Sequence, residues 1–148
     1  MRSGPLVLCA TVVMLAAAWR LPQGIPGTKR SVSIIFKCEL DGGATATIKP
    51  WRIRLLAKSD YIEWKLVAPG PGDVAPDSVL ISPKFINQWP FTTKFPVVVK
   101  KGYTNVAQGI PTSVPEGTYK YSVTGICRLP GLPPDTVVID PDMIIPPI

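Results

Sequence analysis

The sequence predicts an all-β domain, and three observations support this fold class. Proline is unusually frequent, at 18 of the 148 residues, and proline is excluded from helix interiors while it suits the turns between strands. Apolar and polar residues alternate with a period of two in several segments. No segment of useful length has helical spacing. About seven to eight short strands separated by turn signals indicate a sandwich or a barrel, and we expect a Greek-key β-sandwich.

Residues 1–18 have the features of a signal peptide. Arg2 supplies positive charge, an apolar run follows from Leu6 to Ala18, and the small residues at its end suit a cleavage site. The run is short for a membrane span and Arg20 follows at once, which favours cleavage over a retained anchor. We therefore expect export, to a periplasm or to the extracellular space, with no stable membrane span after cleavage.

Cleavage would leave two cysteines, Cys38 and Cys127, and a net charge of about +5. Disulfides persist in exported proteins, so we expect a structural bridge between these two residues, with two buried thiols as the alternative. A redox role is disfavoured because neither cysteine has a nearby CxxC partner. The basic residues are spread along the chain and form no run, so we expect no nucleic-acid partner.

The folded domain is expected over residues 31–148. Residues 19–30 are rich in Pro and Gly and predict an extended lead-in. A long strand follows, in which alternate residues from Val32 to Leu40 form one buried face. Ile53–Leu55 and Tyr61–Leu66 are joined by a polar turn and predict a β-hairpin, which a Pro- and Gly-rich surface loop follows.

Apolar, mostly β-branched segments predict the remaining strands. The best patterned is Gly117–Cys127, where Tyr119, Tyr121, Val123 and Cys127 share one face that we expect to point inward. The other predicted strands are Val79–Ile81, Phe95–Val99, Thr136–Ile139 and Met143–Ile145. Cys38 and Cys127 both fall on apolar faces, which would let them meet between the two sheets.

Two sequence motifs resemble those of cupredoxins, the plastocyanin- and azurin-like proteins. From Lys49 to Trp64 the chain has a Pro, a strand, a polar turn and a strand that ends in Trp. Pro115–Tyr121 is similar to the Pro-Gly-Thr-Tyr-x-Tyr strand of that family. The resemblance spans about residues 31–145 and implies a cupredoxin-like sandwich. In copper-binding members the second motif leads into a cysteine ligand two residues after the second aromatic.

The copper ligands of that family are missing here. Val123 occupies the position of the cysteine ligand, and the chain contains no histidine. Blue-copper sites require one Cys sulfur and two His nitrogens. We therefore expect no copper and no other cofactor.

The absence of histidine also excludes Ser-His-Asp and Cys-His catalysis and the usual catalytic zinc sites. A pair of carboxylates could still act as in glycosidases, but the candidates are interpreted as solvated turn and strand-face residues. These candidates are Asp60, Glu63, Asp73 and Asp77. We expect no enzymatic activity. A calcium site at Asp135, Asp140 and Asp142 is a weaker alternative to simple Asp-Pro turns and strand ends.

Trp89 and Phe91 are the candidates for surface recognition, because they lie in an irregular segment near prolines. Trp64 ends an apolar strand and is expected in the core. We place the binding surface at a loop end that carries Pro69–Pro76 together with Trp89–Phe91. The expected function is a non-catalytic exported binding or structural module, whose partner is another protein or a polysaccharide. An immunoglobulin-like adhesion or carbohydrate-binding domain is the alternative, and parallel pairing of the first strand would favour the cupredoxin-like fold.

Overall fold

The computed structural model describes residues 27–41, 43–56, 59–110 and 113–147, which form ten strands and no helix. The predicted signal peptide and residues 19–26 of the predicted lead-in lie outside these residues. The strands are β1 (Lys29–Cys38), β2 (Ala44–Lys49), β3 (Arg52–Arg54), β4 (Tyr61–Val67), β5 (Ser78–Pro83), β6 (Val97–Lys100), β7 (Thr104–Ala107), β8 (Gly117–Cys127), β9 (Asp135–Ile139) and β10 (Asp142–Ile145). The all-β prediction is confirmed.

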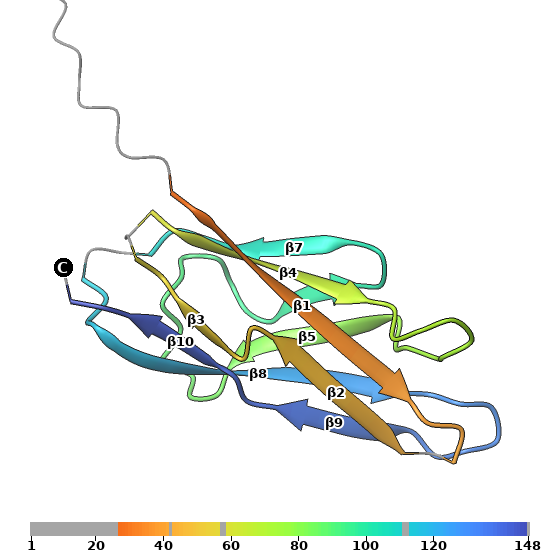
Figure 1. Cartoon of the computed structure of the whole chain (residues 1–148). Helices are drawn as coiled ribbons and strands as arrows, with labels where there is room; N and C mark the ends of the chain where they lie inside the picture. The colour runs from red at the N-terminus through yellow and green to blue at the C-terminus, as the bar shows by residue number, and fades with distance from the viewer. Residues whose placement is uncertain (1–26, 42, 57–58, 111–112, 148) are drawn as a thin grey trace, which may run out of the picture.

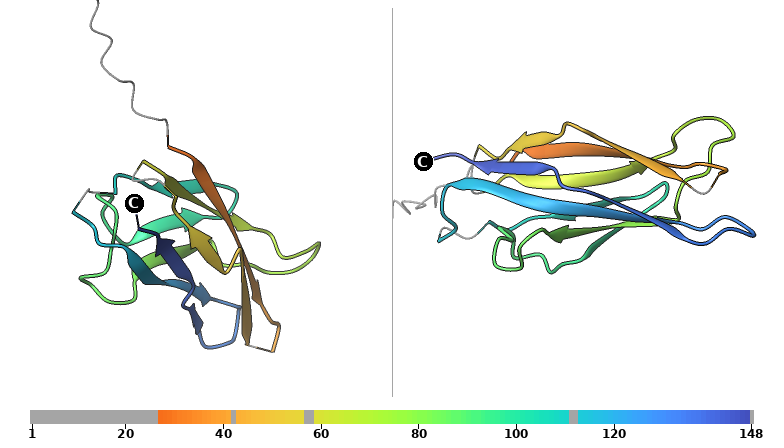
Figure 2. Two further views of the ribbon diagram at one scale, coloured as in Figure 1. Left: turned by 60° about the vertical axis from the view of Figure 1, so that its left-hand side comes forward. Right: turned by 90° about the horizontal axis from the view of Figure 1, so that it is seen from below.

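The strands form two mixed sheets that face each other as a sandwich (Figures 1 and 2). One sheet has the order β2-β1-β4-β7, and the other has the order β3-β10-β8-β5-β6, with β9 paired to β8. Two pairs are parallel, β1 with β4 and β3 with β10, and all other pairs are antiparallel. Each sheet therefore contains one parallel pair of strands. Between the two strands of each pair, the chain passes through the other sheet.

The strand count exceeds the prediction because β2 and β7 are short and polar. Their sequences, ATATIK and TNVA, contain no apolar run that would mark them as strands. Each forms an edge of the four-stranded sheet, where one face and one side meet solvent. Polar residues are tolerated at such edges. Hydrophobic patterning therefore finds the central strands and misses these two.

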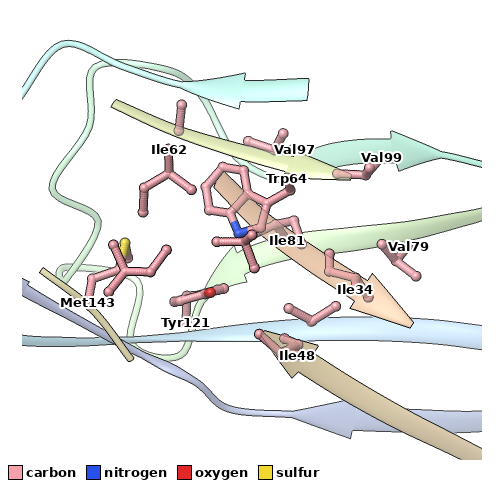
Figure 3. Packing of buried hydrophobic residues seen from close by; sticks show 14 of the residues in the cluster. Ile34, Ile48, Ile62, Trp64, Val79, Ile81, Val97, Val99, Tyr121 and Met143 are labelled. Atoms are coloured by element: carbon pink, nitrogen blue, oxygen red, sulfur yellow. The ribbon is translucent and has the colours of Figure 1, made fainter. Parts of the chain in front are cut away.

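The core lies between the sheets and is built around large aromatic side chains. Trp64 from β4, Tyr121 from β8 and Phe36 from β1 are fully buried, and aliphatic residues from both sheets surround Trp64 and Tyr121 (Figure 3). Burial raises the pKa of Tyr121 to about 12, so its hydroxyl stays neutral at physiological pH. A Cβ at Gly125 would overlap the Phe36 ring, which explains a glycine within the longest strand.

Two details of the predicted strands are wrong. β1 ends at Cys38, so Leu40 leaves the predicted buried face and is 82% exposed. The predicted hairpin of Ile53–Leu55 with Tyr61–Leu66 does not form. β3 pairs with β10, whereas β4 pairs with β1 and β7 in the other sheet. The polar turn between them thus carries the chain from one sheet to the other instead of folding it back on itself.

Asp60 explains this crossing. The prediction of a solvated turn residue is wrong, because the Asp60 side chain is only 2% exposed. Its carboxylate accepts hydrogen bonds from the backbone N–H groups of Thr28 and Leu56, both at 2.9 Å, and pairs with Arg30 at 3.3 Å. Burial alone would raise the pKa of Asp60, but these three partners together hold it below its usual value. The carboxylate therefore links the residue before β1 to both ends of the segment that connects β3 with β4.

The stability of the domain should fall as the pH drops through the lowered pKa of Asp60. A carboxyl whose pKa is lower in the folded state stabilises the fold above the pKa of the unfolded chain and loses that contribution on protonation. Asp60→Asn should lower the free energy of unfolding at pH 7 by about 2–3 kcal/mol, since buried donors lose a charged partner. It should also flatten the decline below about pH 4. Urea unfolding between pH 2 and 7 measures both effects.

Asp41→Asn, at an exposed turn, is the control, and equal behaviour of the two variants would contradict the role of Asp60.

The structure joins Cys38 and Cys127 in a disulfide, with a Cα–Cα distance of 5.5 Å. The bridge connects the last residue of β1 to the last residue of β8, and so links the two sheets at one end of the sandwich. The closed loop is long, with a sequence separation of 89 residues.

Replacing both Cys38 and Cys127 by Ser should lower the free energy of unfolding by roughly 4–5 kcal/mol in the chain-entropy model. The reason is that the unfolded chain regains the freedom of the long loop. Urea unfolding of the wild type with and without reductant, beside the double variant, measures the effect. A wild-type unfolding midpoint that does not change when reductant is added would contradict this account.

Candidate functional site

Val123, the residue that the predicted resemblance places at the cysteine ligand position of cupredoxins, lies inside the core. Val123 is fully buried in the middle of β8, between Ile81 of β5 and Ile139 of β9. β8 continues for four more residues and ends at Cys127, whose sulfur is bonded to Cys38. Among the residues that the structure describes, no group of three or more His, Cys, Asp or Glu side chains could hold a metal ion.

The acidic residues singled out in the sequence do not converge. Asp140 bonds Lys84 and accepts a hydrogen bond of 2.7 Å from the Ser122 hydroxyl. The hydrogen bond from Lys84, followed by that from Ser122, lowers the pKa of Asp140.

Asp142, by contrast, is buried and pairs with Arg52 at 2.9 Å and with Lys120 at 3.2 Å. The hydrogen bond from Arg52 is the main cause of its lowered pKa. Asp140 and Asp142 thus form ion pairs with different cations, and Lys120 helps to lower the pKa of both. Carboxylates already paired with cations do not support the calcium alternative. The glycosidase candidates Glu63 and Asp73 likewise pair with lysines, Lys29 at 3.1 Å and Lys37 at 3.4 Å.

Trp89 and Phe91 take part in packing. Trp89 stacks on the buried Trp64, with ring centroids 6.4 Å apart and an interplanar angle of 14°, and its indole N–H donates to the Thr93 carbonyl at 2.6 Å. Phe91 is only 6% exposed and meets Trp89 edge to face. Trp64 is in the core, as predicted. Phe91 therefore has almost no surface to offer a partner, and Trp89 offers part of its ring only.

The two segments that were expected to form one loop end lie at opposite ends of the sandwich (Figure 1). The loop before β5 contacts the end of β1, where Cys38 and Val74 form an isolated bridge. The segment after β5 begins beside the start of β8, where the Lys84 N–H bonds the Lys120 carbonyl. Its most exposed apolar residues are Phe85 and Ile86, which sequence patterning did not single out.

The second sheet presents an apolar outer face that the sequence analysis missed. Val98, Leu80, Thr124 and Val138 are paired in register across β6, β5, β8 and β9. Leu80 is 36% exposed and Val138 is 53% exposed. Ile126, two residues after Thr124 on β8, adds a further exposed aliphatic side chain. We call these five residues the apolar outer face. Its residues carry no charge, in contrast to the polar outward residues usual on a solvated sheet.

A pocket of about 400 Å³ continues this face toward the loop before β5. Leu80, Thr124 and Ile126 belong to both, and the loop contributes the small apolar side chains of residues 74–76. Asp77 and Arg128 supply opposite charges to the lining. The predicted recognition loop at Pro69–Pro76 thus borders the apolar outer face, while Trp89 lies elsewhere.

The outer face of the four-stranded sheet is different in kind. The row in register there is Lys49, Ser33, Lys65 and Thr104. Lys29 and Glu63 form an ion pair on the same sheet. The two sheets therefore present different rows to solvent, one with two lysines and one without charge.

Comparison with known proteins gives no relative for this chain: no family model, no curated protein and no solved structure matches it. Within the described residues, no helix is long and apolar enough to cross a membrane.

Trp89→Ala should destabilise the domain by about 2–4 kcal/mol, because it removes the ring that covers Trp64. Ile86→Ala in the same segment is the matched control. Its side chain is 80% exposed, so its truncation should change the free energy of unfolding by less than about 0.5 kcal/mol. Chemical denaturation followed by circular dichroism measures both. A Trp89→Ala variant as stable as wild type would restore Trp89 as a residue kept for recognition.

Proposed function

We propose that this chain is an exported, copper-free, non-catalytic module with a cupredoxin-like Greek-key fold, and that it binds another protein through the apolar outer face. The surface consists of the register row of Val98, Leu80, Thr124 and Val138 with Ile126, and it includes the adjoining pocket.

The strand pairing favours a cupredoxin-like fold over an immunoglobulin-like one. β1 pairs with β4 in parallel over seven residue pairs, from Lys29 with Tyr61 to Ile35 with Val67. Parallel pairing of the first strand is the feature that we use to separate the two folds. The two motifs that resemble cupredoxins also fall on matching elements, since Pro115–Tyr121 leads into the long strand β8. Val123 then replaces the ligand cysteine, which supports a copper-free member.

The disulfide supports export. A bond between Cys38 and Cys127 is compatible with an oxidising compartment such as a periplasm or the extracellular space. It agrees with the signal-peptide features of residues 1–18.

The apolar outer face is the observation that carries the binding proposal. Exposed contiguous apolar surface on a soluble protein commonly marks an interaction site. Depletion of charge at the centre of the surface is the compositional sign of a protein interface. The polar face of the other sheet shows that the composition of the chain does not impose this feature. A polysaccharide partner is less well supported, because sugar rings stack on flat aromatic side chains and the five residues of the face are aliphatic or Thr.

Site-specific photocrosslinking in the producing cells tests this proposal. A benzoylphenylalanine at position 138 should give a discrete crosslinked product with a protein, and the same residue at Thr47 should not. Thr47 is the matched position, because it is exposed on the outer side of β2 in the other sheet.

A second substitution decides whether the product reflects this face. Leu80→Lys, introduced together with the crosslinker at position 138, should reduce the product at least tenfold, because a lysine in a desolvated apolar contact must be stripped of water. Thr47→Lys should leave it unchanged. Melting temperatures close to wild type show that both lysine variants fold. Equal products from positions 138 and 47, or a product insensitive to Leu80→Lys, would overturn the proposal.

A further inference from the structure

A basic groove lies between the two sheets at the end opposite the disulfide. β2 pairs with β1 only from Ser33 onward, and the chain then crosses to the other sheet as β3. The first residues of β1 and the strand β3 border a groove of about 390 Å³. The start of β1 and the strand β3 lie toward the same end of the sandwich (Figure 1). Its lining consists of Lys29, Arg30, Ser31, Pro50, Arg52, Ile53, Arg54 and Leu56. Four of these eight residues are cationic and none is acidic.

Buried carboxylates hold two of the arginines in place. Arg30 donates its Nε and Nη2 hydrogens to Asp60, and Arg52 donates the same two groups to Asp142. A guanidinium has five N–H donors, so each arginine keeps its Nη1 hydrogens for another acceptor. The carboxylates are 2% and 5% exposed, which fixes the arginines without covering the groove. Side chains positioned in this way lose little conformational entropy when they bind an anion.

The groove keeps a positive charge after its ion pairs are counted. Arg54 has no carboxylate partner in the described part of the chain, and Asp142 is shared between Arg52 and Lys120. Lys29 and Arg30 each pair with one acid. Four cations, counting Lys120, thus share three carboxylates, Asp60, Glu63 and Asp142, and Arg54 is an additional positive charge. An anion with several oxygens, such as a phosphate, would fit forked guanidinium donors.

Exposed apolar side chains accompany the groove and indicate the source of the phosphate. Leu56 lines it and is 60% exposed, and Trp51, between the lining residues Pro50 and Arg52, is 49% exposed. Tryptophan beside basic residues is typical of surfaces that rest on a membrane, where the ring sits at the headgroup level. Basic side chains near such a surface are attracted to anionic lipids. A free inorganic phosphate would gain nothing from Trp51 or Leu56.

We propose that this groove binds the phosphate group of an anionic membrane lipid, with Arg52 and Arg54 as its main ligands and Trp51 and Leu56 in contact with the lipid interface. The site is separate from the apolar outer face and does not depend on it. It would orient the domain with the start of β1 toward the membrane and the disulfide end away from it.

Solution NMR of the full-length chain in neutral maltoside micelles tests the site. Dihexanoyl-phosphatidylglycerol should shift the Arg52 and Arg54 Nε–Hε signals and the Trp51 indole signal in a saturable way. Dihexanoyl-phosphatidylcholine at the same mole fraction should shift them far less, because its net charge is zero. Arg54→Gln should weaken binding about fivefold, as expected for one cation at a membrane surface.

The choice of variants keeps the test independent of folding. Arg54 is not tied to a buried acid, so its replacement leaves the Asp60 and Asp142 contacts intact. Arg128→Gln is the matched control, because Arg128 is an exposed arginine at the opposite end and should leave the affinity unchanged. Equal weakening by both variants, or equal shifts with the two lipids, would overturn the proposal. Saturation by inorganic phosphate with no added effect of the lipid would also overturn it, since it would identify a site for the free ion.

Discussion

The fold depends on one buried carboxylate. Asp60 lies between two strands of different sheets and accepts hydrogen bonds from the backbone at Thr28 and Leu56. These two contacts lie just before β1 begins and just after β3 ends, and β4 starts at the next residue after Asp60. The parallel pairing of β1 with β4 then follows from Lys29 opposite Tyr61. The same carboxylate orients Arg30, which is one of the four cations that line the basic groove.

The sequence specifies the central strands well and their partners poorly. The alternation in β1 and β8 and the burial of Trp64 are visible in the pattern of apolar residues, because each central strand has one face in the core. Alternation carries no information about which strand lies alongside, so β3 and β4 look like a hairpin although they belong to different sheets. The hydrogen bonds of Asp60 favour the observed arrangement, and a polar residue in a turn gives no sign that it is buried.

The candidate surfaces were hidden for a related reason. Val79–Ile81 and Val97–Val99 are uninterrupted apolar runs, and a run of this kind does not reveal which side chains face outward. The structure turns Leu80 and Val98 to solvent and their neighbours to the core. The basic groove is likewise assembled from residues more than twenty positions apart, between Lys29 and Arg52. The prolines near Trp89 drew attention to a residue that stacks on Trp64 instead.

The position of the disulfide has a mechanical consequence. The start of β1 and the end of β10 lie at one end of the sandwich, and the Cys38–Cys127 bond lies at the other (Figure 1). If tension were applied between the start of β1 and the end of β10, only β1 and the segment after Cys127 could be extended. The extended length of these segments is roughly 100 Å, whereas the whole described chain without the bond would extend to roughly 400 Å. The residues between the two cysteines, which include β4 and β5 with the buried Trp64, would stay in a covalent ring that carries no load along its own backbone. A tethered domain under shear would thus lengthen by a fixed, limited amount and keep the strands needed to refold.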